Sequence, residues 1–231
     1  IQNIGTIAKS GTAQFLSDMA GEKKKDSNLI GQFGVGFYSV FMVADKVSVH
    51  SRAASSKSED AVLWESSGED TYQISNIPKE QRGTTITIYL NEDNKEFSEH
   101  MRVKFLLQKY SQYINFPLIL NPEEGDPEVI NDSDAIWLKS KRSVKEQEYK
   151  DFYKFISYDA NDPLTWMHNK VEGKQEYTSL LFIPEKSPYD LWNRDTPRGI
   201  KLFIQRVFIM DDAAHFLPLY LRFVKGVVDS S

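Results

Sequence analysis

A largely apolar run at residues 37–44 follows directly on a glycine-rich stretch, in which three of the chain's 12 glycines fall within residues 31–36. Glycine admits positive φ and has no Cβ, so main-chain N–H groups there can approach a ligand closely. The pattern predicts a loop that leads into a buried helix, whose N-terminus would favour a phosphate group. A tight turn that only packs a helix against a sheet is the alternative, since the glycine order matches neither the dinucleotide-binding motif nor the P-loop.

Alternation of apolar and polar residues predicts strands after this run. The clearest strand is 84–90, where Ile86, Ile88 and Leu90 are expected to point inward between β-branched neighbours. Strands that meander after a glycine-led helix predict a two-layer α/β sandwich, with helices on one face of the sheet. The other strands are expected at residues 45–52, 62–65 and 71–74.

A helical period replaces the alternation near residue 103, where apolar side chains recur every three or four positions. Residues 115–120 then predict an edge strand that closes a first domain and tolerates Pro117. Residues 121–127 concentrate proline, glycine and acidic residues, which is the composition of an exposed linker. We therefore expect a first domain, a linker and a second α/β unit at residues 1–120, 121–134 and 135–231.

The second unit is expected to alternate helix, strands and helix. Ser143 to Glu146 has the spacing of a capping box and predicts the start of a helix with a buried aromatic stripe. Two long strands are expected at 177–184 and 199–210, and a helix at 216–225. The stripe consists of Tyr149, Phe152, Tyr153 and Ile156.

Composition narrows the classes of function. The net charge of −5, from 28 basic and 33 acidic residues, argues against nucleic acid as a partner. The absence of cysteine excludes disulfides and thiolate chemistry, and four scattered histidines indicate no metal site. No apolar run approaches the roughly 20 residues that span a bilayer, so we expect no membrane contact and a cytoplasmic location.

Three segments, Asn3–Gly11, Gly31–Phe37 and Gly83–Thr84, together resemble the heat-shock 90 kDa chaperone family. The resemblance extends along nearly all of the chain and is strongest to the bacterial members. Within that family Gly5–Gly11 resembles the start of the ATP lid, and Gly31–Phe37 resembles the phosphate-binding end of the lid. The third segment resembles the threonine motif on the adenine side.

The resemblance implies an ATP-binding fold of the GHKL type, shared with gyrase, histidine kinases and mismatch-repair ATPases, followed by part of a middle domain. It also implies an ATP-hydrolysing chaperone that uses ATP/ADP with Mg²⁺, binds client proteins and forms a homodimer through a region beyond Ser231. The family's general-base glutamate, magnesium-binding asparagine and adenine-reading aspartate would precede Ile1, and its middle-domain arginine would follow Ser231. We therefore expect a fragment with no catalytic residue of its own, inactive when alone.

Nucleotide contact is implied for seven residues. Lys9 would supply a mobile positive charge, Phe37 would pack on the nucleotide or in the core, and the Thr84 hydroxyl would bond adenine directly or through water. Leu191 and Trp192 lie in a polar, proline-bracketed segment that resembles the family's client-binding loop. The full set of nucleotide contacts is Asn3, Lys9, Gly34, Val35, Gly36, Phe37 and Thr84.

Two alternatives remain open from the sequence. One is a catalytically inactive module that binds proteins through the same surfaces without nucleotide. The other is an ATPase of the gyrase or mismatch-repair type, which shares the glycine loop. The acidic charge balance and the aromatic second unit argue against a DNA partner of that kind.

Overall fold

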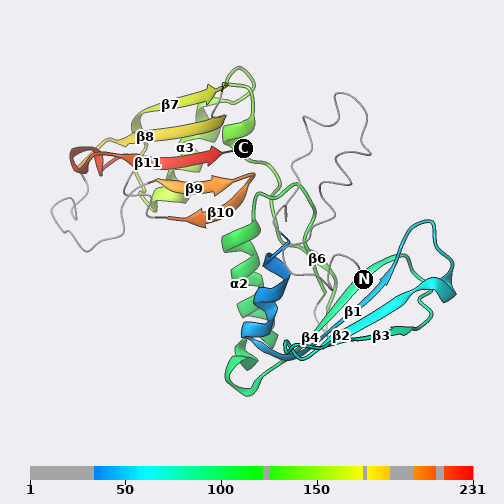
Figure 1. The fold of residues 1–231 in the computed structure, drawn as a ribbon. Coiled ribbons are helices and arrows are strands. Elements are labelled where there is room, and N and C mark those ends of the chain that lie inside the picture. Colours follow the sequence, from blue (N-terminus) through cyan, green and yellow to red (C-terminus); the bar gives the residue numbers. More distant parts are fainter. Residues whose placement is uncertain (1–33, 122–124, 174–175, 188–199, 212–215, 231) are drawn as a thin grey trace. The chain divides into compact units, whose positions relative to one another are not determined.

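The structure is a computed structural model that describes residues 34–121, 125–173, 176–187, 200–211 and 216–230. The chain divides into two compact units, Ile1–Val103 and Lys104–Ser231, which are considered separately below. Both units combine helices with strands, so the predicted α/β class is confirmed (Figure 1).

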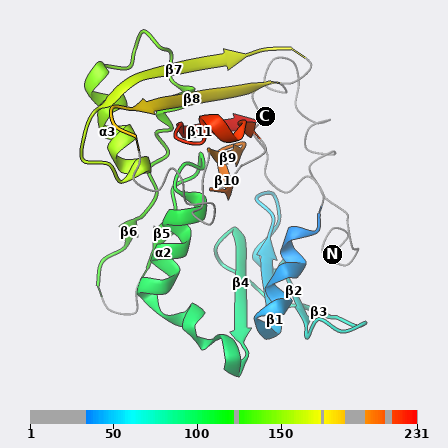
Figure 2. The same ribbon diagram turned by 90° about the vertical axis from the view of Figure 1, so that its left-hand side faces the viewer.

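The first unit is built on a four-stranded antiparallel sheet with the order β3-β2-β1-β4. The 3₁₀-helix η2 packs on this sheet through its aromatic residues, and Figure 2 shows it in blue beside β1 and β2. The strands predicted at 45–52, 62–65, 71–74 and 84–90 are confirmed, each within about two residues of its expected bounds. The strand predicted at 115–120 is reduced to the two residues of β5 (Ile119–Leu120). The elements are η2 (Gly36–Met42), β1 (Ala44–Arg52), η3 (Ser58–Asp60), β2 (Val62–Ser66), β3 (Gln73–Asn76), β4 (Gly83–Leu90) and η4 (Glu92–Ser98).

The predicted buried helix after the glycines is wrong. The segment forms a seven-residue 3₁₀-helix without a buried residue, and β1 already begins at Ala44. Val43 is tied to the sheet, because its carbonyl accepts the N–H of Asn91 at 3.0 Å, just beyond β4. Pairing with both β2 and β4 therefore takes the end of the apolar run into a central strand.

The expectation that Ile86 and Ile88 point into a core is also wrong for the described residues. Their side chains are 49% and 43% exposed. They face the same side of the sheet as the buried Val47 and Val49, with which they pair across β1 and β4. The core on this face is thus confined to the part of the sheet that η2 covers.

Helix α2 (His100–Ser111) contains the division between the units and confirms the helical period predicted from residue 103. Within the second unit, β6 (Glu128–Val129) pairs with β5 (Ile119–Leu120), and Asn131 Oδ1 accepts the Leu118 N–H at 2.7 Å. Part of the predicted linker is therefore hydrogen-bonded to the strand before it. The domain boundary predicted at 121–134 stays a prediction.

The second unit contains a five-stranded sheet with the order β10-β9-β11-β8-β7, in which only β11 and β9 run parallel. Helix α3 lies along one face of this sheet (Figure 1). The elements are η5 (Ile136–Leu138), α3 (Glu146–Ser157), β7 (Pro163–Val171), β8 (Tyr177–Pro184), β9 (Lys201–Ile204), β10 (Val207–Met210), η7 (Leu219–Leu221) and β11 (Lys225–Ser230).

The aromatic stripe of α3 is core, as predicted. Tyr149, Tyr153 and Ile156 are buried, and Phe152 packs against the same cluster. The predicted cap is displaced: the Ser143 hydroxyl donates to the Ser140 carbonyl at 2.8 Å and does not cap the helix. Lys145 is the N-cap instead, and its N–H donates to the Glu148 carboxylate at 2.9 Å.

Three further predictions for the second unit need correction. The strand expected at 199–210 is a hairpin, because Gln205 and Arg206 adopt positive φ of 48° and 67°. The helix expected at 216–225 reduces, within the described residues, to the short η7 followed by β11. Strands β7 and β11 were not predicted at all, whereas β8 has the predicted bounds.

No helix in the described parts of the chain combines the length and the apolar character needed to cross a bilayer.

Candidate functional site

The described part of the glycine-rich stretch starts at Gly34, whose φ of +64° lies in the left-handed region. Val35 follows in a right-handed conformation with half of its surface exposed. The Tyr38 N–H donates to the Val35 carbonyl at 3.1 Å, and the Ser39 hydroxyl donates to the Gly36 carbonyl at 2.7 Å. These bonds hold the loop in one compact turn in which only Gly34 requires glycine for its backbone angle.

Gly36 is not required to be glycine by the described part of the structure. Its φ is not positive, and a Cβ built on it meets no atom of the described residues within 4 Å. Among these residues the loop is therefore open on the side that Gly36 presents. The partial positive charge at the N-terminus of η2, which would favour a phosphate group, is smaller than expected. A 3₁₀-helix of seven residues aligns fewer peptide dipoles than a long α-helix.

Phe37 fixes the loop to the sheet. Its ring meets Trp64 edge-on at a centroid distance of 5.7 Å, and it packs on the cluster that contains Val47 and Val49. An edge-to-face pair of this kind contributes about 1 kcal/mol beyond the area it buries. Among the described residues Phe37 thus packs in the core, which is one of the two roles predicted for it. Its other predicted role, packing on the nucleotide, stays a prediction.

Thr84 lies at the start of β4, opposite Ser51 of β1. The two hydroxyl oxygens are 2.8 Å apart, so one donates to the other. Ser51 is two positions from Val49, and alternate residues of a strand share a face. Thr84 therefore lies on the face of the sheet that carries Phe37 and η2.

The same face has an uncovered part next to Thr84. Ile86 and Ile88 follow Thr84 at alternate positions of β4 and are both more than 40% exposed. Trp64 is 5% exposed, and among the described residues its indole N–H has no hydrogen-bond partner. The face next to Thr84 thus offers exposed apolar surface and hydroxyl groups, which are suited to a planar, polar-edged ligand.

Four predicted site residues lie outside the described parts of the chain. These are Asn3 and Lys9 of the predicted nucleotide site, and Leu191 and Trp192 of the predicted client loop. Sequence reasoning missed Ser51, the partner of Thr84. The alternation that predicted the strand at 45–52 placed Ser51 on the face of Val47 and Val49, so this signal was available.

Within the described ranges, no three histidine, aspartate or glutamate side chains lie close enough together to hold a metal ion.

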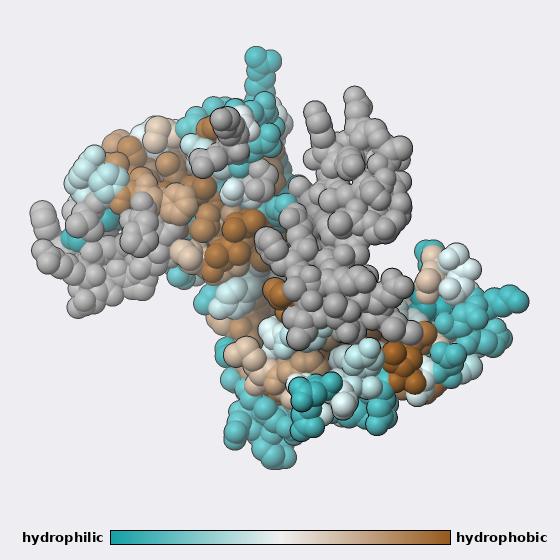
Figure 3. Space-filling view, in the orientation of Figure 1, coloured by the Kyte–Doolittle hydropathy of each residue, from teal (hydrophilic) through white to brown (hydrophobic). Residues whose placement is uncertain are grey.

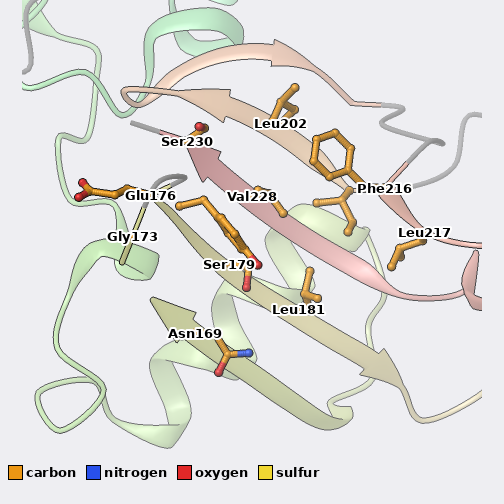
Figure 4. Close-up of a pocket in the computed structure, with 12 residues that line it drawn as sticks. Asn169, Gly173, Glu176, Ser179, Leu181, Leu202, Phe216, Leu217, Val228 and Ser230 are labelled. Atoms are coloured by element: carbon orange, nitrogen blue, oxygen red, sulfur yellow. The ribbon is translucent and has the colours of Figure 1, made fainter. Parts of the chain in front are cut away.

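A second hollow, of about 960 Å³, lies on the face of the five-stranded sheet opposite α3 (Figure 4). Leu181, Leu202 and Val228 form its apolar floor, and Asn169 and Ser179 add polar groups. Figure 3 shows hydrophobic residues gathered over this region of β8, β9 and β11. Among the described residues of the lining, Glu176 contributes the one carboxylate.

Comparisons with known proteins bear on the family of the chain. A family model described as "Hsp90 protein" matches residues 121–231. Proteins described as "Chaperone protein HtpG" from Escherichia coli K12, Escherichia coli O157:H7 and Shigella boydii serotype 4 are each 55% identical over 238 aligned residues. The chain belongs to the Hsp90 family. The alignments cover all of this chain and 38% of each relative, so the chain spans well under half the length of these Hsp90-family proteins.

Proposed function

We propose that this chain contributes the lid and phosphate half of a nucleotide site to an ATP-dependent chaperone of the Hsp90 family. Its 55% identity to proteins described as chaperones supports this proposal. In the proposed complex the backbone at Gly34, Val35 and Gly36 holds phosphate groups of ATP or ADP, and Thr84 bonds the adenine side. Bound ATP supplies a transferable γ-phosphoryl group, and Mg²⁺ offsets its charge.

One observation carries the proposal, namely that Thr84 and the Phe37-anchored loop share one face of the same sheet. These residues are far apart in the sequence, and only the strand register brings them to one side. Exposed Ile86 and Ile88 extend that face beside Thr84 with apolar surface against which a purine can pack. Lys9 and Asn3 are proposed to complete the phosphate side.

The proposal is tested by nucleotide titration calorimetry on the full-length gene product, comparing Thr84→Val with Thr87→Val. Both substitutions remove a hydroxyl from β4 and keep a β-branched side chain, but Thr87 pairs with Ser48 on the opposite face. We expect Thr84→Val to weaken ADP binding about tenfold, the effect of losing one good hydrogen bond, and Thr87→Val to leave it unchanged.

A further control separates the ligand contact from the contact within the protein. Ser51→Ala breaks the Ser51–Thr84 hydrogen bond but leaves the Thr84 hydroxyl in place. We expect ADP affinity within about twofold of the parent in this variant. Equal weakening by Thr84→Val and Thr87→Val would exclude the proposed site, and absence of nucleotide binding would favour a protein-interaction module without nucleotide.

We also propose that the 231 residues alone do not hydrolyse ATP, because the family's catalytic carboxylate is expected before Ile1 and its arginine after Ser231. The measurement is phosphate release by purified chain. Turnover that persists in a Gly34→Val variant would indicate a contaminating ATPase, whereas turnover that is lost in that variant would contradict the proposal.

Client proteins are the proposed partners, with Leu191 and Trp192 as contacts. Replacing both residues with serine should leave the thermal midpoint nearly unchanged and reduce the binding of a destabilised client protein. Exposed apolar side chains commonly mark interaction sites, whereas emptying a core site costs several kcal/mol. A large fall in the thermal midpoint would therefore show that the pair is core.

A further inference from the structure

A separate cleft of about 550 Å³ lies within the second unit, between α2 from Phe105 onward, the end of α3 and the β9–β10 hairpin. Its floor is formed by buried or half-buried side chains, among them Phe203 and Phe208. This volume is typical of sites that bind ligands or side chains of a partner. Of the predicted nucleotide residues that the structure describes, Gly34, Val35, Gly36, Phe37 and Thr84, none lines it.

Three aromatic rings at the cleft are largely exposed. Phe105 is 55%, Phe155 56% and Tyr158 91% exposed. Tyr158 also has a left-handed φ of 57° at the end of α3, a position that glycine usually occupies. An L-residue in this conformation costs about 1 kcal/mol. The fold thus holds an aromatic side chain in solvent, in a strained conformation, at the rim of an aromatic cleft.

Two lysines and one carboxylate, that of Asp211, line the cleft, so its described charged groups leave a net positive charge in a chain whose net charge is −5. Lys201 lies half-buried with its Nζ 5.8 Å from the centre of the Phe208 ring, and Lys109 also lines the cleft. Burial lowers the pKa of Lys201, and the charges of Lys109 and Lys225 lower it further, against the attraction of Asp211. In the described parts of the chain, neither Lys109 nor Lys201 has a carboxylate within ion-pair distance.

We propose that this cleft binds an extended peptide segment in which an aromatic or large aliphatic side chain stands next to a carboxylate. The apolar side chain packs among Phe105, Phe155 and Phe208, and the carboxylate pairs with Lys201 and Lys109. A peptide fits better than a small molecule because the rings lie at an open rim, where a chain can enter and leave. Lys201 is half-buried and has no ion pair among the described residues. A carboxylate of the peptide beside it would offset part of the free-energy cost of desolvating its ammonium group.

The test is fluorescence anisotropy with labelled peptides on the 231-residue chain, without nucleotide. This binding does not require the proposed nucleotide site, so either proposal can fail alone. A peptide with the core Asp-Phe-Asp is compared with Lys-Phe-Lys and Asp-Ser-Asp versions of equal length. We expect binding of the first peptide only, with an affinity that falls as salt is raised.

Variants locate the binding. Lys201→Gln and Phe155→Ser should each weaken binding of the Asp-Phe-Asp peptide at least about fivefold, and Lys201→Arg, which keeps the charge, should retain it. The matched controls are Lys170→Gln, an exposed lysine paired with Glu172, and Phe116→Ser, a ring as exposed as Phe155 that does not line the cleft. Thermal midpoints are measured for every variant to show that it is folded.

Several outcomes would overturn the proposal. The first is equal affinity for the three peptides. The second is a loss of Asp-Phe-Asp affinity in the control variants equal to that in the cleft variants. The third is no binding of the Asp-Phe-Asp peptide at about 1 mM. Displacement of the peptide by free phenylacetate at equal concentration would identify a small-molecule site instead. Self-association of the chain that is abolished by Phe155→Ser would identify a second copy as the occupant.

Discussion

The indole N–H of Trp137 donates to the Asp229 carboxylate at 2.9 Å, although the two residues lie 92 positions apart and both are buried. The second oxygen of Asp229 accepts the Arg206 N–H at 3.2 Å. The Trp137 carbonyl accepts His168 Nε2–H at 2.7 Å, so in the neutral ring Nδ1 accepts the Tyr149 hydroxyl at 2.8 Å. This chain of bonds connects β11, η5, β7 and α3 through the interior of the second unit.

Trp137→Phe should destabilise the protein by about 3 kcal/mol, because it leaves a buried carboxylate without one of its donors. The control is Trp166→Phe, which removes the same atoms from a half-buried ring stacked on Tyr149 and should cost clearly less. The measurement is urea unfolding. In a double-mutant cycle, Asp229→Asn should recover part of the Trp137→Phe loss, and strict additivity of the two losses would contradict the coupling.

Alkaline pH should destabilise the second unit through Tyr153. Burial, together with the hydrogen bond to Asp159, raises the pKa of Tyr153 to about 12. Because this pKa exceeds the unfolded value of about 10, the stabilisation is complete below pH 10 and is lost as the pH rises through about 12. At pH 7 the unfolding free energy of Tyr153→Phe should be about 1 kcal/mol lower than that of the parent. Between pH 10 and 12 the variant should lose less unfolding free energy than the parent, because it has no phenol to ionise. Parallel profiles of unfolding free energy for parent and variant would contradict this.

Gly226→Ala should destabilise the chain by about 3 kcal/mol or prevent folding. Gly226 pairs with Leu181 across β11 and β8, and a Cβ built on it would lie 2.2 Å from the Leu180 carbonyl oxygen. Backbone atoms in a central strand cannot move away without breaking the ladder. Gly173→Ala is the control, because a Cβ there meets no atom of the described residues within 4 Å. A thermal midpoint of Gly226→Ala within a few degrees of the control would contradict the predicted clash.

Gly34 and Gly36 should respond differently to alanine. Gly34→Ala should cost about 1 kcal/mol in conformation, because φ at this residue is +64°. Gly36→Ala should have little effect on stability, since its backbone is ordinary and its Cβ has space. If the loop holds phosphate, however, Gly36→Val should fill that space and reduce nucleotide affinity at unchanged thermal midpoint. Equal thermal losses for the two alanine variants would contradict the assignment of the strained glycine.

Local patterns predicted several elements closely. The stripe of Tyr149, Phe152, Tyr153 and Ile156 predicted a core-facing helix, because a 3.6-residue period places these four positions on one side. Strand β8 appears at its predicted residues, since a run rich in β-branched and aromatic side chains suits a buried strand. Likewise the alternation in β1 and β4 sufficed for their bounds.

Other elements depended on partners that the local sequence does not show. Residues 199–210 read as one strand, but the turn at Gln205 and Arg206 is held by Asp229 and Ser230, which accept the Arg206 and Gln205 N–H groups. Residues Lys225 to Ser230 became a strand because β8 and β9 provide hydrogen-bond partners on both sides. The pairing of Thr84 with Ser51 likewise appears only in the register.

The sequence by itself thus determined the α/β class, the helical stripe of α3, the main strands and the family to which the chain belongs. The tertiary structure decided that the apolar run after the glycines ends in strand β1, and that the β9–β10 hairpin turns at Gln205 and Arg206. It also decided that Thr84 shares a face of the sheet with Phe37. The physical reason is that periodicity records which side chains are buried. The choice between helix and strand in a short apolar run is made by backbone hydrogen bonds to distant segments.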